Sequence, residues 1–180
     1  QPDSCVTTVI EGLRMVSPQT DFDFFPFATN LRTMEMSRVL QAKDRARKAD
    51  LAIVVVGENS MRYMWKDKTC GENVDRYELS LVGLQQQLVE EIYATGVPTI
   101  VVMVNGRPLS TEWIAENIPA LVEAWEPGSF GGQAVAEILY GKVNPEAKLP
   151  ITIPRSAGQV QTYYNHKQTS KWFPYGTGKS

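Results

Sequence analysis

The chain has 180 residues, 43% of them hydrophobic and 21% charged, and its net charge at pH 7 is −2. This length suits one domain with a hydrophobic core, and the nearly neutral charge argues against a basic surface that binds nucleic acid. No apolar run approaches the ~20 residues that a bilayer-spanning helix needs, so neither a nucleic acid nor a membrane is expected as a partner.

The first part of the chain predicts two helices with an aromatic segment between them. Residues 5–16 place apolar side chains on one helical face, and residues 37–48 form a second helical pattern with Ser37 as its N-cap. The segment Phe22–Phe27 is rich in phenylalanine but is interrupted by Pro26. We therefore expect this segment to be irregular and packed rather than a helix or strand.

From residue 51 onward, apolar strands alternate with amphipathic helices. LAIVVVG at 51–57 is an unbroken apolar run ended by glycine, the pattern of a strand buried on both faces of a parallel sheet. The further expected elements are a helix at 79–96, a strand at 98–106, a helix at 111–118 capped by Thr111, a strand at 120–128, a helix at 131–141 and an edge strand at 148–154. This alternation predicts a three-layer α/β/α sandwich with a mostly parallel sheet, formed by residues 1–180 as a single domain.

The connection after the first strand, residues 57–76, is the most promising region for function. Ligands of open α/β sheets bind beyond the carboxyl ends of the strands, and a connection of about twenty residues is usually functional or disordered. Carboxylates beside an aromatic ring suit a sugar, and a glutamate against apolar surface can keep its proton as a general acid must. Composition alone nevertheless favours a solvated loop. The carboxylates and the apolar side chains are Glu58, Asp67, Glu72, Asp75, Tyr63, Met64 and Trp65.

Other kinds of site have less support. VVVGENS lacks the further glycines and the Lys-Ser/Thr pair of a phosphate-binding loop. PGSFGGQAV at 127–135 could hold an anion on backbone N–H groups, although a tight turn for close packing is favoured. Cys5 and Cys70 do not make a disulfide framework. His166 is the single histidine, which disfavours a histidine-based metal site or a Ser-His-Asp triad, and no metal or cofactor is expected.

Several stretches, taken together, resemble one known family. GENVDRYELSLVGLQQQLV, PTIVVMVNGRP, the run from Trp125 to Pro154, YYNHK and WFPYGTG follow one another in a specific order and spacing. In this they resemble the second, α/β sandwich domain of glycoside hydrolase family 3, which includes β-glucosidases and β-xylosidases. The resemblance covers roughly residues 38–176 and agrees with the predicted fold.

The resemblance implies a retaining, exo-acting β-glycosidase whose substrate is a β-linked oligosaccharide or glycoside. In such enzymes an N-terminal (β/α)8 barrel carries the aspartate nucleophile, and the sandwich domain supplies the acid/base glutamate across the cleft. Glu72 matches the acid/base residue best, because GENVDRYEL fits the family pattern Glu-Gly-x-Asp-Arg-x-x-Leu. Asn73 stands where glycine is common, and Asn also tolerates unusual backbone angles. Glu58, in the Gly-Glu pair at the strand end, is the second choice for this role.

The same resemblance suggests supporting roles for neighbouring residues. Trp65 and Tyr63 would contact the substrate on its leaving-group side, although Trp65 could equally be a loop anchor. Asp75 and Arg76 would support the loop through an ion pair or local hydrogen bonds. We also expect an apolar face toward the barrel, with candidates in the Phe22–Phe27 segment, Trp65 and Tyr163-Tyr164.

The family's nucleophile motif Ser-Asp-Trp and its barrel are missing from these 180 residues, so the chain alone is expected to be inactive. The first methionine is Met15, and we expect the chain to be a piece of a longer protein. Its cellular location is left open, although relatives of this type are often periplasmic or secreted. The alternatives are a non-catalytic carbohydrate-binding or structural α/β module and a flavodoxin-like nucleotide binder.

Overall fold

The computed structural model describes residues 5–60, 66–159 and 163. Its α-helices and strands are, in chain order, α1 (Val9–Val16), α2 (Met36–Ala46), β1 (Ala52–Gly57), α3 (Gln85–Tyr93), β2 (Thr99–Val104), α4 (Glu112–Asn117), β3 (Ala120–Glu123) and α5 (Gly131–Leu139). A short 3-10 helix, η2 (Ala157–Gln159), follows. None of the helices in the described ranges is long and apolar enough to cross a membrane.

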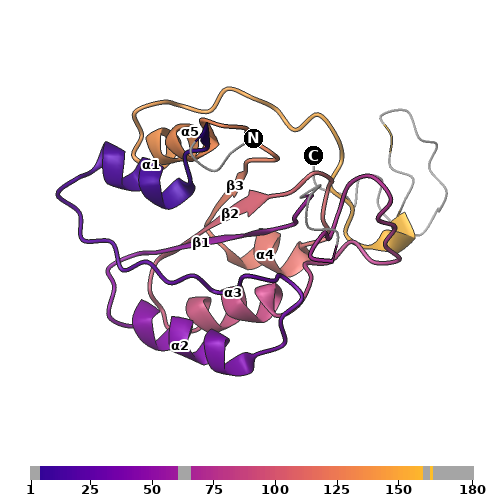
Figure 1. The fold of residues 1–180 in the computed structure, drawn as a ribbon, viewed down its shortest axis with the longest axis horizontal. Coiled ribbons are helices and arrows are strands. Elements are labelled where there is room, and N and C mark those ends of the chain that lie inside the picture. Colours follow the sequence, from indigo (N-terminus) through magenta and orange to yellow (C-terminus); the bar gives the residue numbers. More distant parts are fainter. Residues whose placement is uncertain (1–4, 61–65, 160–162, 164–180) are drawn as a thin grey trace.

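The three strands form one parallel sheet in the order β1-β2-β3, with helices on both of its faces. Figure 1 shows α1 and α5 on one face and α2, α3 and α4 on the other. The three-layer α/β/α sandwich predicted from the alternating pattern is therefore confirmed. Parallel neighbours bring the carboxyl ends of all three strands to one edge of the sheet, where ligands of such folds bind.

The central strand β2 explains why the apolar runs are unbroken. Val101 and Met103 belong to the main core cluster together with Leu88 of α3 and Ile114 of α4. Val102 lies between them and faces the opposite side of the sheet, yet it is also fully buried. Both faces of the strand are covered, which explains why apolar residues follow one another without interruption after Thr99.

Helix α1 begins with a capping box. The N-cap Thr8 accepts a hydrogen bond from the Glu11 N–H through its hydroxyl oxygen (3.4 Å), and the Glu11 carboxylate accepts one from the Thr8 N–H (2.8 Å). These bonds satisfy donors that the first helical turn leaves free. They also lower the pKa of the exposed Glu11 carboxyl, with the backbone bond from Thr8 as the largest cause.

Helices α1 and α5 pack closely through glycines. A Cβ atom on Gly12 would lie 2.2 Å from the Gly132 carbonyl oxygen, and one on Gly132 would lie 2.1 Å from the Thr8 carbonyl oxygen. The Gly132 N–H donates to the Thr7 carbonyl (3.1 Å), and the Thr7 N–H donates to the Ser129 carbonyl (2.7 Å). The glycine-rich segment thus serves close packing, as favoured from its sequence, although its partner is α1 rather than a strand.

The phenylalanine-rich segment packs against α2 without forming a helix or strand. Phe25 and Phe27 contact the core, and the Arg38 guanidinium lies 4.5 Å from the centroid of the Phe25 ring. Phe24 is 52% exposed and Tyr163 is 55% exposed. Among the candidates for an apolar docking face that the structure describes, these two aromatic side chains are the exposed ones. Trp65 and Tyr164 lie outside the described residues.

Three helix starts differ from their predicted positions, and the first is α1, which begins at Val9 with Thr8 as its N-cap rather than at residue 5. Helix α2 begins at Met36 with Glu35 as its N-cap, so the Ser37 cap is wrong. Helix α3 begins at Gln85 rather than 79. Gly83, at a φ of +62°, passes so close to the Leu31 carbonyl oxygen that a Cβ would lie 2.2 Å from it. Because of this contact, residues 79–84 are not helical, although their apolar pattern suits a helix.

The remaining boundaries differ in smaller ways. Thr111 does stand at the N-cap of α4, but its side chain makes no capping hydrogen bond. The expected strand at 148–154 is wrong, because these residues form only an isolated bridge at Ile153. Pro150 and Pro154 bracket that residue and have no N–H to donate to a ladder.

Candidate functional site

The carboxyl ends of the strands line an open depression of about 450 Å³. Glu58 follows β1, the segment 105–107 follows β2, and Glu126 lies just beyond β3. The depression therefore lies where the fold class predicts a ligand site. The residues that line it are Ser60, Lys68, Cys70, Gly71, Glu72, Val74, Gly106, Arg107 and Glu126.

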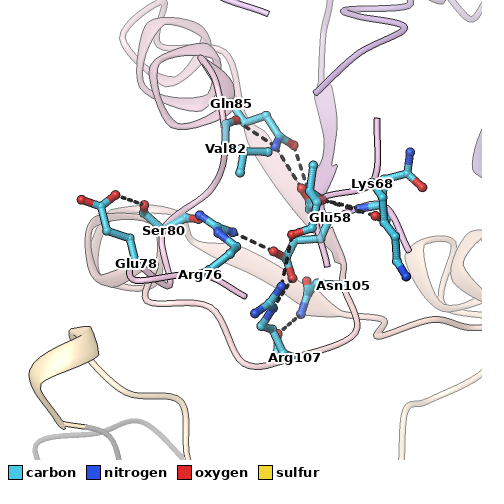
Figure 2. Close-up of polar contacts among 12 residues, drawn as sticks. Glu58, Lys68, Arg76, Glu78, Ser80, Val82, Gln85, Asn105 and Arg107 are labelled. Carbon is cyan, nitrogen blue, oxygen red and sulfur yellow. Dashed lines mark hydrogen bonds and ion pairs between the residues drawn. The ribbon is translucent and has the colours of Figure 1, made fainter. Parts of the chain in front are cut away.

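The end of β1 is fixed by a side chain from α3 (Figure 2). The buried Gln85 accepts a hydrogen bond from the Gly57 N–H through Oε1 (2.8 Å) and donates one to the Gly57 carbonyl through Nε2 (2.9 Å). Gly57 has a φ of +149°, and a Cβ atom there would lie 1.8 Å from the Val104 carbonyl oxygen. Only glycine fits, and the following residue, Glu58, leaves the sheet in one fixed direction.

Glu58 is the centre of an ion-pair network, as Figure 2 shows. Its side chain is 0% exposed, and its two oxygens accept from Nη1 of Arg76 (2.7 Å) and from Nε of Arg107 (3.0 Å). Arg76 also donates to the Ser80 carbonyl (2.6 Å), and Arg107 donates to the Thr69 carbonyl (3.1 Å). Through these bonds, residues at the start, middle and end of the connection between β1 and α3 are linked to one another and to Arg107, just after β2.

Backbone bonds hold the middle of this connection against its beginning. The Thr69 N–H donates to the Asn59 carbonyl (2.8 Å), and the Asn59 N–H donates to the Thr69 hydroxyl (2.7 Å). The Cys70 N–H reaches the same Asn59 carbonyl at 3.3 Å. Burial, and then the nearby negative charge of Glu58, raise the pKa of the Cys70 thiol. A raised pKa disfavours the reactive thiolate form, and Cys70 lies in the lining of the depression.

Glu72 lies on the rim of the depression and is exposed. It sits between two left-handed residues, Gly71 at a φ of +88° and Asn73 at +60°. The left-handed angle at Asn73 explains why asparagine can stand where the family pattern has glycine. Within the described part of the chain, no ion pair holds the Glu72 carboxylate. Its backbone carbonyl accepts a hydrogen bond from Nζ of Lys68 (2.5 Å).

Comparison with known proteins decides the family. Residues 2–180 match the model of the glycosyl hydrolase family 3 C-terminal domain. The chain belongs to glycosyl hydrolase family 3. The resemblance inferred from its motifs is thereby confirmed.

Curated relatives and solved structures agree with the family 3 assignment. A β-xylosidase from Formosa agariphila is 42% identical over an alignment of 154 residues, and the match covers 78% of this chain and 20% of the relative. A periplasmic β-glucosidase from Salmonella typhimurium is 36% identical over 139 residues, 77% of this chain and 17% of the relative. A solved β-glucosidase from Erythrobacter marinus shares 30% identity at a TM-score of 0.77, covering 100% of this chain and 27% of its own. The chain spans about a fifth of the length of these curated relatives.

A β-glucosidase from Listeria innocua, solved in complex with isofagomine, has the same fold at a TM-score of 0.77 and 28% identity. The match covers 98% of this chain and 23% of the Listeria chain. The likeness to this solved structure thus extends over almost the whole chain.

The structure of this family 3 domain places the predicted site residues at different depths. Glu72 is exposed on the depression, whereas the side chain of Glu58 is buried below it. Arg76 supports the loop, but its partner is Glu58 rather than Asp75, which is exposed. Substrate contacts were predicted for Trp65 and Tyr63, which lie outside the described residues.

Sequence reasoning did not single out four side chains that line or support this depression: Lys68, Gln85, Arg107 and Glu126. Arg107 lies in the NGRP turn after β2, and Glu126 lies in the Pro-Gly turn after β3. Both turns follow neighbouring parallel strands, and that position was the signal that could have found them. Lys68 and Gln85 carry no such signal, because their roles depend on contacts that only the folded chain creates.

Two features of the β3 end complete the site. Trp125 is held at a φ of +53°, which is rare for a residue of this size. Its N–H donates to the Glu123 carboxylate (3.2 Å), and burial is the main reason that the pKa of Glu123 is raised.

Within the described ranges, no group of three or more His, Cys, Asp or Glu side chains is arranged to hold a metal ion.

Proposed function

We propose that this chain supplies the acid/base glutamate of a retaining, exo-acting β-glycosidase, and that the residue is Glu72. One observation carries the proposal: Glu72 is exposed on the rim of the depression beyond the strand ends, on a turn held by two left-handed residues. A proton donor must reach a substrate that lies outside this domain. The names of the relatives, β-xylosidase and β-glucosidase, support a β-linked glycoside as the substrate.

The chemistry needs a second carboxylate from another domain. In a retaining enzyme the nucleophile attacks the anomeric carbon while Glu72 donates its proton to the leaving glycosidic oxygen. Glu72, now ionised, takes a proton from the water that attacks the covalent glycosyl-enzyme, which releases the sugar and restores both carboxyl groups. The two carboxyl groups must lie about 5–5.5 Å apart. We propose that an N-terminal barrel domain of the full-length protein carries the nucleophile.

Glu58, the second choice for this role, is unsuited to it. Both of its carboxylate oxygens are engaged by guanidinium groups, and its side chain is 0% exposed. Protonating this carboxylate would leave two arginine charges without a partner below the surface, which is costly. A general acid must also come within hydrogen-bond distance of the leaving oxygen, and a buried carboxylate beneath the depression cannot reach it.

Replacement of Glu72 in the full-length protein tests the proposal. Glu72→Ala should slow hydrolysis of glycosides with poor leaving groups on the order of 100-fold or more, because their departure requires protonation. Dinitrophenyl glycosides, which leave without protonation, should still form the glycosyl-enzyme, and added azide should speed its breakdown. The measurement is a comparison of kcat and kcat/KM on both substrate types, with and without azide.

The exposed Glu146, which lies outside the depression, provides the matched control. Glu146→Gln should leave both rates unchanged. If Glu72→Ala slows both substrate types equally, or neither, then Glu72 does not hold the acid/base role. In that case the alternative of a non-catalytic sugar-binding or structural module gains support.

A further inference from the structure

Lys68 stands out among the residues that line the depression, because it is a lysine with only 4% of its surface exposed. Burying an ammonium group is costly unless polar partners compensate for the lost water. One partner is the backbone carbonyl oxygen of Glu72, at 2.5 Å from Nζ. The buried amine is thus directed at the backbone of the residue that we propose as the proton donor.

The base of Lys68 is firmly attached to the sheet. Its own carbonyl accepts a hydrogen bond from Nη2 of Arg32 (3.2 Å). The next residue, Thr69, is bonded to Asn59 just after β1 and to Arg107 just after β2. The side chain of Lys68 therefore extends from a fixed point toward the rim, and Figure 2 shows it beside the Glu58 network.

The turn that carries Glu72 is closed by one backbone hydrogen bond, from the Val74 N–H to the Gly71 carbonyl (3.1 Å). Gly71 and Asn73, on either side of Glu72, both have left-handed backbone angles and lie on the exposed surface. A Cβ atom at Gly71 would lie 3.4 Å from Cε of Lys68, so the lysine stem runs directly beneath the turn. The contact from Lys68 is the one described side-chain hydrogen bond to residues 71–73.

We infer that Lys68 is a positioning residue, which holds the backbone of Glu72 so that its carboxyl group meets the leaving glycosidic oxygen. This inference rests on the proposed function of Glu72 and assigns a role that the family match does not. The carboxyl groups of a retaining pair tolerate little displacement, and a misplacement of about 1 Å can cost on the order of 100-fold in rate. A lysine that fixes the turn from below would provide this precision.

The test compares two lysines that lie two positions apart in the full-length protein. Lys68→Met keeps an unbranched side chain of similar length but removes the donor. It should lower kcat/KM on a poor-leaving-group glycoside on the order of tenfold to 100-fold, while kcat/KM on a dinitrophenyl glycoside, which reports formation of the glycosyl-enzyme without protonation, stays within about threefold. Lys66→Met, at an exposed position outside the depression, should change neither rate.

The selectivity between leaving groups is the decisive measurement, because general damage to the fold would lower both rates together. Lys68→Arg keeps a charged donor and should recover part of the lost rate on the poor leaving group. Lys68→Gln, too short to reach the carbonyl, should show the same selective loss as Lys68→Met and replaces that variant should it fail to fold. Equal losses on both substrates, or no loss on either, would overturn the inference.

Glu72→Ala, assayed in parallel, separates the two proposals. If Glu72→Ala shows the selective loss and azide rescue but Lys68→Met and Lys68→Gln do not, the positioning role is wrong and the acid/base role stands. If Glu72→Ala lacks that signature, the proposed function itself fails, and the role of Lys68 fails with it.

Discussion

At the scale of single residues, burial assigns different roles to two glutamates that look alike in sequence. Glu58 and Glu72 lie in the same connection, and each directly follows a glycine. Glu58 receives two arginines below the surface, whereas Glu72 faces the depression. The first therefore stabilises the loop, and the second has the exposure that the proposed acid/base role requires.

The role of Glu58 predicts a large stability effect. Glu58→Gln keeps the shape of the side chain but leaves Arg76 and Arg107, 11% and 24% exposed, without their counter-charge. Removing one partner of a buried ion pair costs about 3–5 kcal/mol, and the remaining exposure of the arginines reduces the expected loss to about 2–4 kcal/mol. Urea denaturation of the chain measures it, with the exposed Glu146→Gln as control. Equal stability of both variants would contradict the structural role.

The Glu58 network also shows where sequence reasoning reaches its limit. The position of the site at the carboxyl ends of the strands was predictable, because a parallel sheet requires it. The partner of Arg76 was not, since adjacency in sequence favoured Asp75. Arg107 contacts Glu58 across 49 positions of the chain, and one sequence read alone contains no sign of such a pairing.

At the scale of elements, periodic patterns predicted the type of each element better than its ends. The strands β1 and β2 were predictable because burial on both faces requires unbroken apolar runs. The start of α3 was not, because Gly83 passes against the backbone at Leu31 and prevents an earlier helical turn. The contact between α1 and α5 was also hidden, since a glycine inside a helix indicates only lower helix propensity.

That helix contact predicts an unusual result at Gly12. Within a helix, a Gly→Ala substitution ordinarily stabilises by about 1 kcal/mol. Here the new methyl group would lie 2.2 Å from the backbone carbonyl of Gly132, and a backbone atom cannot move aside by changing rotamer. Overpacking typically costs about 1–3 kcal/mol, so we expect Gly12→Ala to reduce the free energy of unfolding by about 1–2 kcal/mol.

Gly158→Ala is the matched control, because its nearest neighbour would be the Ser156 hydroxyl at 3.5 Å, an ordinary contact. Denaturant unfolding of both variants gives the comparison. A Gly12→Ala variant as stable as the original chain would show that α1 and α5 separate easily, and that this pair of helices does not hold the N-terminal segment in place.

At the scale of the whole molecule, the depression is only partly enclosed by this chain. The depression is open and is lined by charges of both signs, Lys68, Arg107, Glu72 and Glu126. Sites that bind small molecules tightly bury most of the ligand surface, and a sugar resting here would keep one face in water. The relatives are about four times as long as the chain, and the proposed function requires a second domain to close the site.

This incomplete enclosure predicts that the isolated chain neither binds nor cleaves sugars. Titration with glucose, xylose or cellobiose should give no heat that corresponds to a Kd below about 1 mM, which is about 4 kcal/mol of binding free energy. Dinitrophenyl glycosides should remain uncleaved, since the covalent intermediate needs a nucleophile from the other domain. The full-length protein, assayed beside it, should bind and turn over. Submillimolar binding by the chain alone would instead support a carbohydrate-binding module, because the depression would then hold a sugar without any second wall.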